Sequence, residues 1–358
     1  MIPSTYRKLQ VIKLSRDFKE ATEIVEQKTE EIGEDEVLVQ VNYVGVNASD
    51  INYTAGSYRP GVQPPFECGF EAVGTVLKAG SKCVAFKIGS AVGYTGFGAY
   101  TELLICKGNR LLPLPYCVPE AIPLLVSGLT ASLALEEVGE MKNVVSAAGK
   151  KEKPEVVLVT AAAGGTGIFA CQLAKIAGHY VIGTCSSDEK AEFLRNVIGV
   201  DRAINYRKEN LDKVLKREFK NGIDIVYESV GGETFETCCS HLAVKGRLIV
   251  IGMIAGYVDG SSWNSSASQF GGASLSSILL QKSASVRGFF LNHFRASSLR
   301  HTQKLVDLVS AGKLSSIVDP QPFYGLESIH SAVQYMYSGK NIGKVVVTIT
   351  PPSHTSKL

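Results

Sequence analysis

The sequence predicts an α/β protein in which a doubly wound parallel sheet is combined with a β-rich domain. Residues 156–183 read as strand, glycine-rich turn, helix and strand, which together form a βαβ unit. From about residue 127 onward strand and helix patterns alternate, whereas residues 1–126 are β-rich and interrupted by glycine and proline. At 358 residues the chain is about twice the length of a typical domain, which favours two domains.

The βαβ unit opens with an apolar, β-branched run, 156–160, which is typical of a strand buried on both faces. Small residues follow in the spacing A-x-x-G-x-x-G, before a helix expected over 167–177. A Cβ in such a turn would hold a pyrophosphate away from the backbone N–H groups and the positive end of the helix. The residues predicted to bind a dinucleotide there are Ala161, Gly164, Gly165, Thr166 and Gly167. The alternative is a tight strand-to-helix turn that binds nothing.

The remaining elements follow from periodicity and from glycine and proline punctuation. Strands are expected over 37–44, 71–77, 180–183, 224–228, 247–252 and 285–290. Helices are expected over 187–197, 210–219, 232–241 and 297–310. The serine- and glycine-rich segment 260–277 is interpreted as a mobile loop, and 344–349 as a final strand that could rejoin the first domain.

Composition indicates a soluble globular protein, with 45% hydrophobic and 20% charged residues. The net charge of +3 comes without a basic block, so neither nucleic acid nor an anionic membrane is expected as a partner. The uncharged stretch 156–174 is almost long enough to span a membrane, but its glycine cluster and β-type opening favour a cytosolic fold, and no membrane span is expected. The eight cysteines form no C-x-x-C pair, which indicates a reducing compartment without a disulfide framework.

Seven stretches together resemble the medium-chain dehydrogenase/reductase superfamily over nearly the whole chain. They are VNASDINYTAG, PFECGFEAVGTV, LVSGLTAS, AAAGGTG, CSSDEKAEFL, ESVGG and NIGKVVV. The A-x-x-G-x-x-G turn is similar to that of the quinone-reductase branch. The resemblance implies a GroES-like catalytic domain in two parts, 1–126 and 303–358, around a Rossmann-type NADPH-binding domain, 127–302. A homodimer is expected as well.

The resemblance also bears on zinc. Zinc dehydrogenases hold their catalytic ion with a Cys where Asn47 stands here, and with the His of a G-H-E triplet that reads Gly69-Phe70-Glu71 in this chain. The four-Cys lobe for structural zinc is missing after Gly89. Because Glu71 and Cys68 alone make no closed coordination shell, no metal is expected.

The end of the second strand indicates the form of the cofactor. NAD enzymes usually carry Asp or Glu there, whereas this chain reads Thr184-Cys185-Ser186-Ser187. Lys190 lies one helical turn after Ser186, so a hydroxyl and an ammonium could meet one phosphate. By resemblance to quinone reductases, Ser186, Lys190 and Tyr206 bind the 2′-phosphate of NADPH. The alternative is a solvated helix N-terminus capped by serine.

The resemblance implies further cofactor contacts. It places Thr166 and Ser229 near the pyrophosphate and ribose. At the nicotinamide end of the cofactor it places Ile251, Tyr257, Phe289, Phe290, Leu291 and Asn341. Isolated Ile and Phe residues at such positions are as often part of a core as of a binding site.

Two tyrosines are candidates for the chemistry. Without a metal, hydride addition to a polarised double bond needs a donor for the developing oxyanion and an acid for the carbon. Tyr257 follows the strand 247–252 and resembles a substrate-facing tyrosine of the prostaglandin reductases. Tyr53 resembles the active-site tyrosine of quinone reductases. Each could instead be a surface or packing ring, and the cofactor ribose and solvent could supply the proton.

Substrate contacts are assigned to Asn47, Tyr53, Trp263 and Phe270. The favoured activity is NADPH-dependent reduction of the carbon–carbon double bond of α,β-unsaturated ketones, including 15-oxo-prostaglandin-like lipids. The alternatives are a quinone oxidoreductase and a non-catalytic NADPH-binding protein on the same fold. No Ser-His-Asp order stands near a glycine turn, so hydrolysis is not supported.

The sequence ends in Ser356-Lys357-Leu358, the tripeptide that the peroxisomal import receptor reads at a free carboxyl terminus. The expected address is the peroxisome, with the cytosol as a second location. Chance occurrence of the tripeptide is the alternative.

Overall fold

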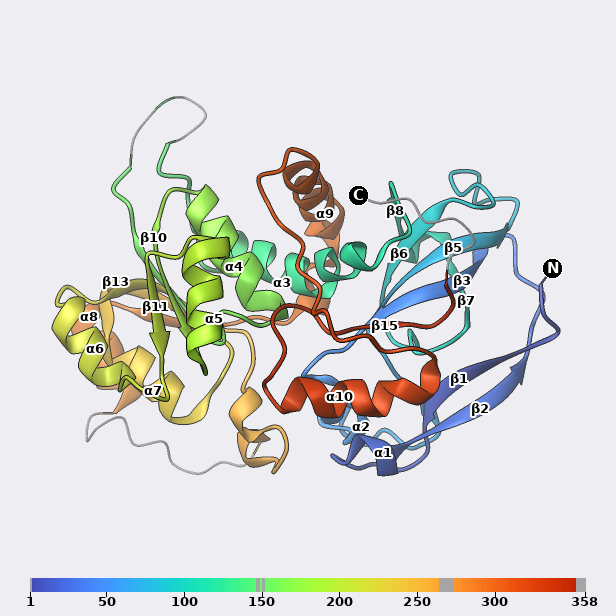
Figure 1. Ribbon diagram of the computed structural model, residues 1–358, viewed down its shortest axis with the longest axis horizontal. Coiled ribbons are helices and arrows are strands. Elements are labelled where there is room, and N and C mark those ends of the chain that lie inside the picture. Colours follow the sequence, from blue (N-terminus) through green and yellow to red (C-terminus); the bar gives the residue numbers. More distant parts are fainter. Residues whose placement is uncertain (1, 146–148, 150–151, 264–273, 352–358) are drawn as a thin grey trace. The chain divides into compact units, whose positions relative to one another are not determined.

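The computed structural model describes residues 2–145, 149, 152–263 and 274–351. The chain forms two compact units, Met1–Val126 with Ser316–Leu358, and Ser127–Ser315 (Figure 1). Two of the sequence predictions, the substrate contact Phe270 and the terminal tripeptide 356–358, lie outside the described residues.

The second unit contains a six-stranded sheet in which every neighbouring pair is parallel. Its strands are β9 (Val156–Val159), β10 (Tyr180–Cys185), β11 (Arg202–Asn205), β12 (Ile223–Glu228), β13 (Leu242–Val250) and β14 (Ser285–Gly288). The spatial order is β11-β10-β9-β12-β13-β14, so the winding direction reverses between β9 and β12. This order is the Rossmann arrangement, in which ligands bind at the carboxyl ends of the strands near the reversal. The predicted doubly wound parallel sheet is confirmed.

The helices of this unit lie mostly between successive strands of the sheet, while the first of them precedes β9 and the last follows β14 (Figure 1). They are α3 (Val126–Leu133, continued by a π-helical turn, Ala134–Val138), α4 (Gly165–Ile176), α5 (Asp188–Phe193, continued by a π-helical turn, Leu194–Ile198), α6 (Leu211–Glu218), α7 (Gly232–Ser240), α8 (Leu275–Lys282) and α9 (Arg295–Ser310). One core cluster joins alternate strand residues, among them Leu158, Val226 and Leu248, to Leu215 of α6 and Cys239 of α7. Successive side chains of a strand point to opposite faces of the sheet. Because both faces of a parallel sheet are buried, the strands are apolar on both faces.

Two sequence predictions in this unit need correction. The segment 260–277 is not a loop throughout, because Ser274 caps α8 by accepting a hydrogen bond from the Ser277 N–H, 3.2 Å away. The domain boundary expected at residue 302 falls inside α9, and this helix lies wholly within the second unit. His301, fully buried on α9, has its Nδ1 2.7 Å from the Ser132 hydroxyl of α3, so the helix is tied to this unit's core.

The first unit consists mainly of antiparallel sheets, as expected of a GroES-like domain. Three strands form one sheet: β1 (Thr5–Val11), β2 (Thr22–Lys28) and β4 (Phe66–Glu67). The other strands form the second sheet: β3 (Glu36–Gly45), β5 (Glu71–Ala79), β6 (Ala91–Thr95), β7 (Leu103–Lys107), β8 (Leu111–Leu114) and β15 (Val346–Thr348). β15 pairs with β3, Val346 opposite Gly45, and this pairing joins the return segment to the first part of the chain.

Short helices complete the first unit. They are α1 (Phe18–Ala21), α2 (Asp50–Thr54), α10 (Ile329–Tyr337) and 3-10 turns at Gly108–Arg110, Pro119–Leu124 and Leu326–Ser328. Among the described residues one helical stretch, Pro119–Val138, has the length and apolar composition of a membrane span. Of its most apolar window 83% is buried inside the protein, as in a core helix.

Candidate cofactor and active site

The turn between β9 and α4 has the geometry of a phosphate-binding turn. Ala161 adopts a left-handed backbone with φ of +49°, and the Gly164 N–H donates back to the Ala161 carbonyl over 3.0 Å. A Cβ on Gly167 would lie 2.5 Å from the Ala161 oxygen, so only glycine lets the helix pack this close to the turn. Gly164, Gly165 and Thr166 remain partly exposed at the start of α4, where the first N–H groups have no partner within the helix.

A second turn at the strand reversal is held by a buried carboxylate that the sequence analysis did not single out. Glu228, at the end of β12, accepts hydrogen bonds from the N–H groups of Val230 (2.8 Å) and Gly231 (3.1 Å). Burial raises the pKa of Glu228. The Thr160 hydroxyl, just after β9, accepts from the Ser229 N–H over 2.8 Å. The Ser229 hydroxyl oxygen is itself buried and has no hydrogen-bond partner among the described residues, which makes it available to a ligand.

The carboxyl ends of β10 and β11 bring together the residues predicted for a 2′-phosphate. The N-cap of α5 is Ser187, which accepts from the Lys190 N–H over 3.2 Å, and Ser186 is not the capping residue. Tyr206 is 52% exposed directly after β11. The sequence analysis overlooked Asp188, a carboxylate in the first turn of α5.

Asp188 is paired with neighbouring donors. Its Oδ1 accepts from the Asn205 side chain over 2.8 Å, and its Oδ2 forms an ion pair with Lys208. The hydrogen bond from Lys208, followed by that from Asn205, lowers the pKa of Asp188. The negative charge at this end of the sheet is therefore compensated by Lys208.

The residues assigned to the nicotinamide lie in both units. Ile251 follows β13 and donates its N–H to the backbone carbonyl of Glu228 over 2.7 Å, and Phe289 follows β14 and stacks on Phe294 with ring centroids 4.9 Å apart. Phe290 and Leu291 directly follow Phe289 in the sequence. Ile251 thus lies at the carboxyl end of β13, and residues 289–291 lie at the carboxyl end of β14. Asn341 belongs to the first unit, where its side chain donates to the Gly343 carbonyl over 2.9 Å.

Tyr257 lies in the loop that follows β13. It is 6% exposed, and its hydroxyl oxygen accepts a hydrogen bond from the Met253 N–H over 2.9 Å. A Cβ on Gly252 would lie 2.9 Å from that hydroxyl, so glycine makes room for it. The Ser262 hydroxyl closes the loop by donating to the Met253 carbonyl over 2.7 Å. Trp263 lies in the 3-10 turn Ser261–Trp263 and is 42% exposed.

Tyr53 lies on α2 of the first unit, among aromatic rings. It stacks on Phe97 at 4.6 Å between centroids and meets Phe66 and Phe70 edge-on, each at 5.3 Å. Its hydroxyl accepts from Arg59 over 3.4 Å, while burial raises its pKa. A phenol of raised pKa stays protonated at neutral pH and can donate a hydrogen bond.

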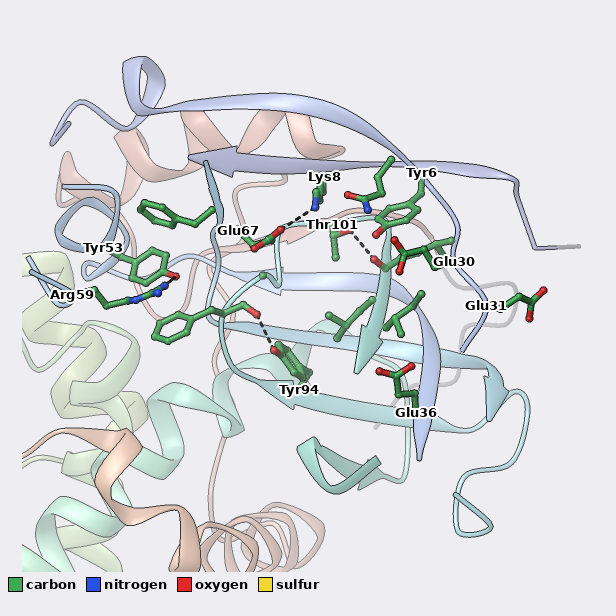
Figure 2. A pocket seen from close by; sticks show the side chains of 17 residues that line it. Tyr6, Lys8, Glu30, Glu31, Glu36, Tyr53, Arg59, Glu67, Tyr94 and Thr101 are labelled. Carbon is green, nitrogen blue, oxygen red and sulfur yellow. Dashed lines mark hydrogen bonds and ion pairs between the residues drawn. The ribbon is translucent and has the colours of Figure 1, made fainter. Parts of the chain in front are cut away.

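Tyr53 also lines a cavity of about 440 Å³ within the first unit. Figure 2 shows Tyr53 and Arg59 at one end of it and glutamates, among them Glu30 and Glu36, at the other. The aromatic end is chemically suited to an apolar, polarisable ligand.

Asn47 has both amide hydrogens engaged. They are donated to the Gly45 carbonyl (3.2 Å) and to Glu71 Oε1 (2.9 Å), while Asn47 Oδ1 accepts from the Lys344 ammonium over 2.7 Å. Lys344 also lies 2.5 Å from Glu71 Oε1. Asn47 therefore has no amide hydrogen left for a substrate in this arrangement.

The residues considered for a metal are engaged elsewhere. Cys68 is buried, its thiol donates to the Leu9 carbonyl over 3.4 Å, and burial raises its pKa. In the described part of the chain no three His, Cys, Asp or Glu side chains are grouped so that they could hold a metal ion.

Comparison with known families agrees with this architecture. Residues 33–116 match the model described as alcohol dehydrogenase GroES-like domain, and residues 165–311 match the model described as zinc-binding dehydrogenase. The chain belongs to the medium-chain dehydrogenase/reductase superfamily and is an oxidoreductase of that family.

Three individual proteins are similar to this chain over nearly its whole length. Prostaglandin reductase-3 of Mus musculus is 47% identical over 98% of this chain and 91% of the relative. A probable quinone oxidoreductase of Leishmania amazonensis is 46% identical over 97% of this chain and 99% of the relative. The structure of Escherichia coli quinone oxidoreductase complexed with NADPH superposes with a TM-score of 0.79, at 28% identity, covering 96% of this chain and 99% of that one.

Proposed function

We propose that the protein is an NADPH-dependent, zinc-independent reductase of the carbon–carbon double bond in α,β-unsaturated ketones, with 15-oxo-prostaglandin-like lipids as substrates. The observation that carries the proposal is the dinucleotide turn at the strand reversal, together with the serines Ser186 and Ser187 that follow the neighbouring strand β10 and precede Lys190 on α5. The kinship with prostaglandin reductase-3 and with an NADPH-bound quinone oxidoreductase supports this choice.

Different residues would bind the pyrophosphate, the 2′-phosphate and the ribose of the cofactor. The first turn of α4, with Gly164 and Thr166, would hold the pyrophosphate through backbone N–H groups. Ser186 and Lys190 would hold the 2′-phosphate by charge-assisted hydrogen bonds. The unpartnered Ser229 hydroxyl would meet a ribose hydroxyl.

The bound nicotinamide supplies the hydride for the reaction. The part of the protein is to stabilise the negative charge that develops on the substrate oxygen and to deliver a proton. A neutral phenol meets both needs, and Tyr257 or Tyr53 is the group that provides it. Apolar packing around Tyr53 strengthens a hydrogen bond of this kind, because the local dielectric is low.

Steady-state kinetics with NADPH test the proposal directly. An enone such as a 15-oxo-prostaglandin and a quinone are compared as acceptors, and the enone product is identified by mass spectrometry. Saturation of the reduced carbon–carbon bond supports the proposal. Turnover of the quinone alone would indicate the quinone oxidoreductase alternative. Tight NADPH binding without turnover of either acceptor would indicate a non-catalytic binding protein.

The cofactor assignment predicts a selective loss in Lys190→Ala. If the Lys190 ammonium contacts a 2′-phosphate, the variant weakens NADPH binding by about 1.5–3 kcal/mol and leaves NADH binding nearly unchanged, because NADH lacks that phosphate. Dissociation constants for both cofactors, measured by fluorescence titration, check this. Lys216→Ala on the exposed side of α6 is the matched control. Equal losses for both cofactors would remove the basis of the assignment.

Zinc independence predicts that activity survives strong chelation. Glu71 is already neutralised by Lys344, and a metal would have to displace that ammonium. Elemental analysis of the purified protein should find less than about one zinc per chain, and dialysis against a chelator should leave kcat unchanged. Stoichiometric zinc that is lost together with activity would contradict this prediction.

A further inference from the structure

Lys344 is an ammonium buried in the first unit. Its Nζ lies 2.5 Å from Glu71 Oε1 and 2.7 Å from Asn47 Oδ1, and the side chains of Lys344 and Glu71 are 4% and 0% exposed. Desolvating two charges is expensive, and an apolar pair of similar volume is often as stable or more stable. Stability alone therefore does not account for a charged pair here.

The pair holds the polar groups that hydrogen-bond to it. Glu71 Oε1 accepts from the Asn47 amide, and Oε2 accepts from the Val126 N–H over 2.9 Å. The second amide hydrogen of Asn47 goes to Gly45, and a Cβ on Gly45 would overlap Glu71. The Asn47 side chain is thus fixed at both of its polar ends.

Fixing Asn47 fixes the start of α2. The Asn47 N–H donates to Asp50 Oδ2 over 2.8 Å, and the Tyr100 hydroxyl donates to the same oxygen over 2.6 Å. The Val46 N–H donates to the Val345 carbonyl over 3.0 Å, so the residue after Lys344 holds the same turn from the other side. Asp50 is the first residue of α2, and Tyr53 follows within this five-residue helix.

We propose that Lys344, through Glu71 and Asn47, is a positioning residue for Tyr53. The cluster formed by Lys344, Glu71 and Asn47 sets the turn between β3 and α2, and this turn sets where the Tyr53 phenol points. The inference rests on the proposed function because its kcat readout requires Tyr53 to act on the substrate, whereas its NMR readout does not.

Four variants separate positioning from plain stability: Lys344→Met, Glu71→Gln, the double variant, and Lys340→Met as an exposed control on the same return segment. Each single change in the cluster leaves one buried charge unpaired, so the folding equilibrium constant should fall by about two to three orders of magnitude. The double variant should recover most of that loss, because both charges are gone.

Turnover should not recover with stability. Methionine cannot donate to Asn47 Oδ1, so kcat for the reduced acceptor should stay about 10- to 100-fold low in the double variant, as expected for a small displacement of a catalytic group. KM should move less than kcat, and the NADPH dissociation constant should change far less than kcat because the glycine turn proposed for the pyrophosphate belongs to the other unit. Recovery of kcat together with stability would overturn the proposal.

The loss of kcat caused by Lys344→Met must also depend on the Tyr53 hydroxyl. In a Tyr53→Phe background, adding Lys344→Met should lower kcat/KM no further, because residues that act on the same step are not additive. Independent of turnover, the NMR signals of ¹³C-labelled tyrosine, with Tyr53 assigned by its loss in Tyr53→Phe, should shift in Lys344→Met and not in Lys340→Met. Additive losses, or an unshifted Tyr53 signal, would each refute the positioning role.

Discussion

Tyr257→Phe is expected to lower kcat for an enone by about 10- to 1000-fold, the range for removal of an oxyanion donor or a general acid. The Tyr257 hydroxyl stands beyond the carboxyl end of β13, where doubly wound sheets bind their ligands. Because an oxyanion donor stabilises the transition state more than the ground state, the chemical step should suffer more than substrate binding does.

The matched comparison is Tyr53→Phe, which removes the same atom from a ring packed in the first unit. Both variants are assayed with NADPH and the same enone, and kcat and KM are determined separately. NADPH affinity and unfolding by urea serve as controls, because losing the acceptor of the Met253 N–H should cost about 1 kcal/mol of stability. A fall of less than about threefold in Tyr257→Phe would transfer the role to Tyr53, or to the cofactor and solvent.

The parts of the fold that follow from local pattern were predictable from the sequence. The run 156–159 and the glycine spacing after it specify a strand, a turn and a helix through local sequence pattern, and the structure places β9 and α4 there. The start of α8 was missed because the cap at Ser274 is one serine among many in a serine-rich segment. The boundary at residue 302 divided a continuous helix, because α9 is held by His301, a contact over long sequence distance.

The polar clusters of the candidate site could not be predicted from local sequence patterns. Lys344 was predicted only as part of the motif NIGKVVV and as the start of the strand 344–349, since its partner Glu71 lies far away in the sequence. No sequence pattern indicated Asp50 or Tyr100 either, because the two residues are far apart in the sequence and form their buried hydrogen bond only in the folded chain. Glu228 could have been found, since a carboxylate at a strand end, three residues before a glycine pair, can accept from the N–H groups of the turn that follows.

Burial of Asp50 has a consequence for the pH dependence of stability. Desolvation raises the pKa of Asp50 from 3.8 to about 7, against the hydrogen bonds from Tyr100 and from the Asn47 N–H and the charge of Lys344. The groups that face it are Tyr100, Cys68, Glu71 and Lys344. Between these two pH values the folded state holds a proton that the unfolded chain releases. The stabilisation from Asp50 is thus fully present below about pH 3.8 and is lost as pH rises through about 7.

Asp50→Asn is therefore expected to gain stability relative to the unmodified protein as pH rises. From pH 5 to pH 8 the difference in unfolding free energy should grow by about 2–4 kcal/mol in favour of the variant, at 1.36 kcal/mol per pKa unit. Asparagine has the same shape and can accept from Tyr100 and Asn47, and its amino group would replace Asp50 Oδ1, which has no hydrogen-bond partner among the described residues. Urea unfolding at several pH values measures the difference, and Asp307→Asn on the exposed face of α9 is the control. Stability curves for Asp50→Asn and the unmodified protein that run parallel over this range would show that Asp50 does not titrate in it.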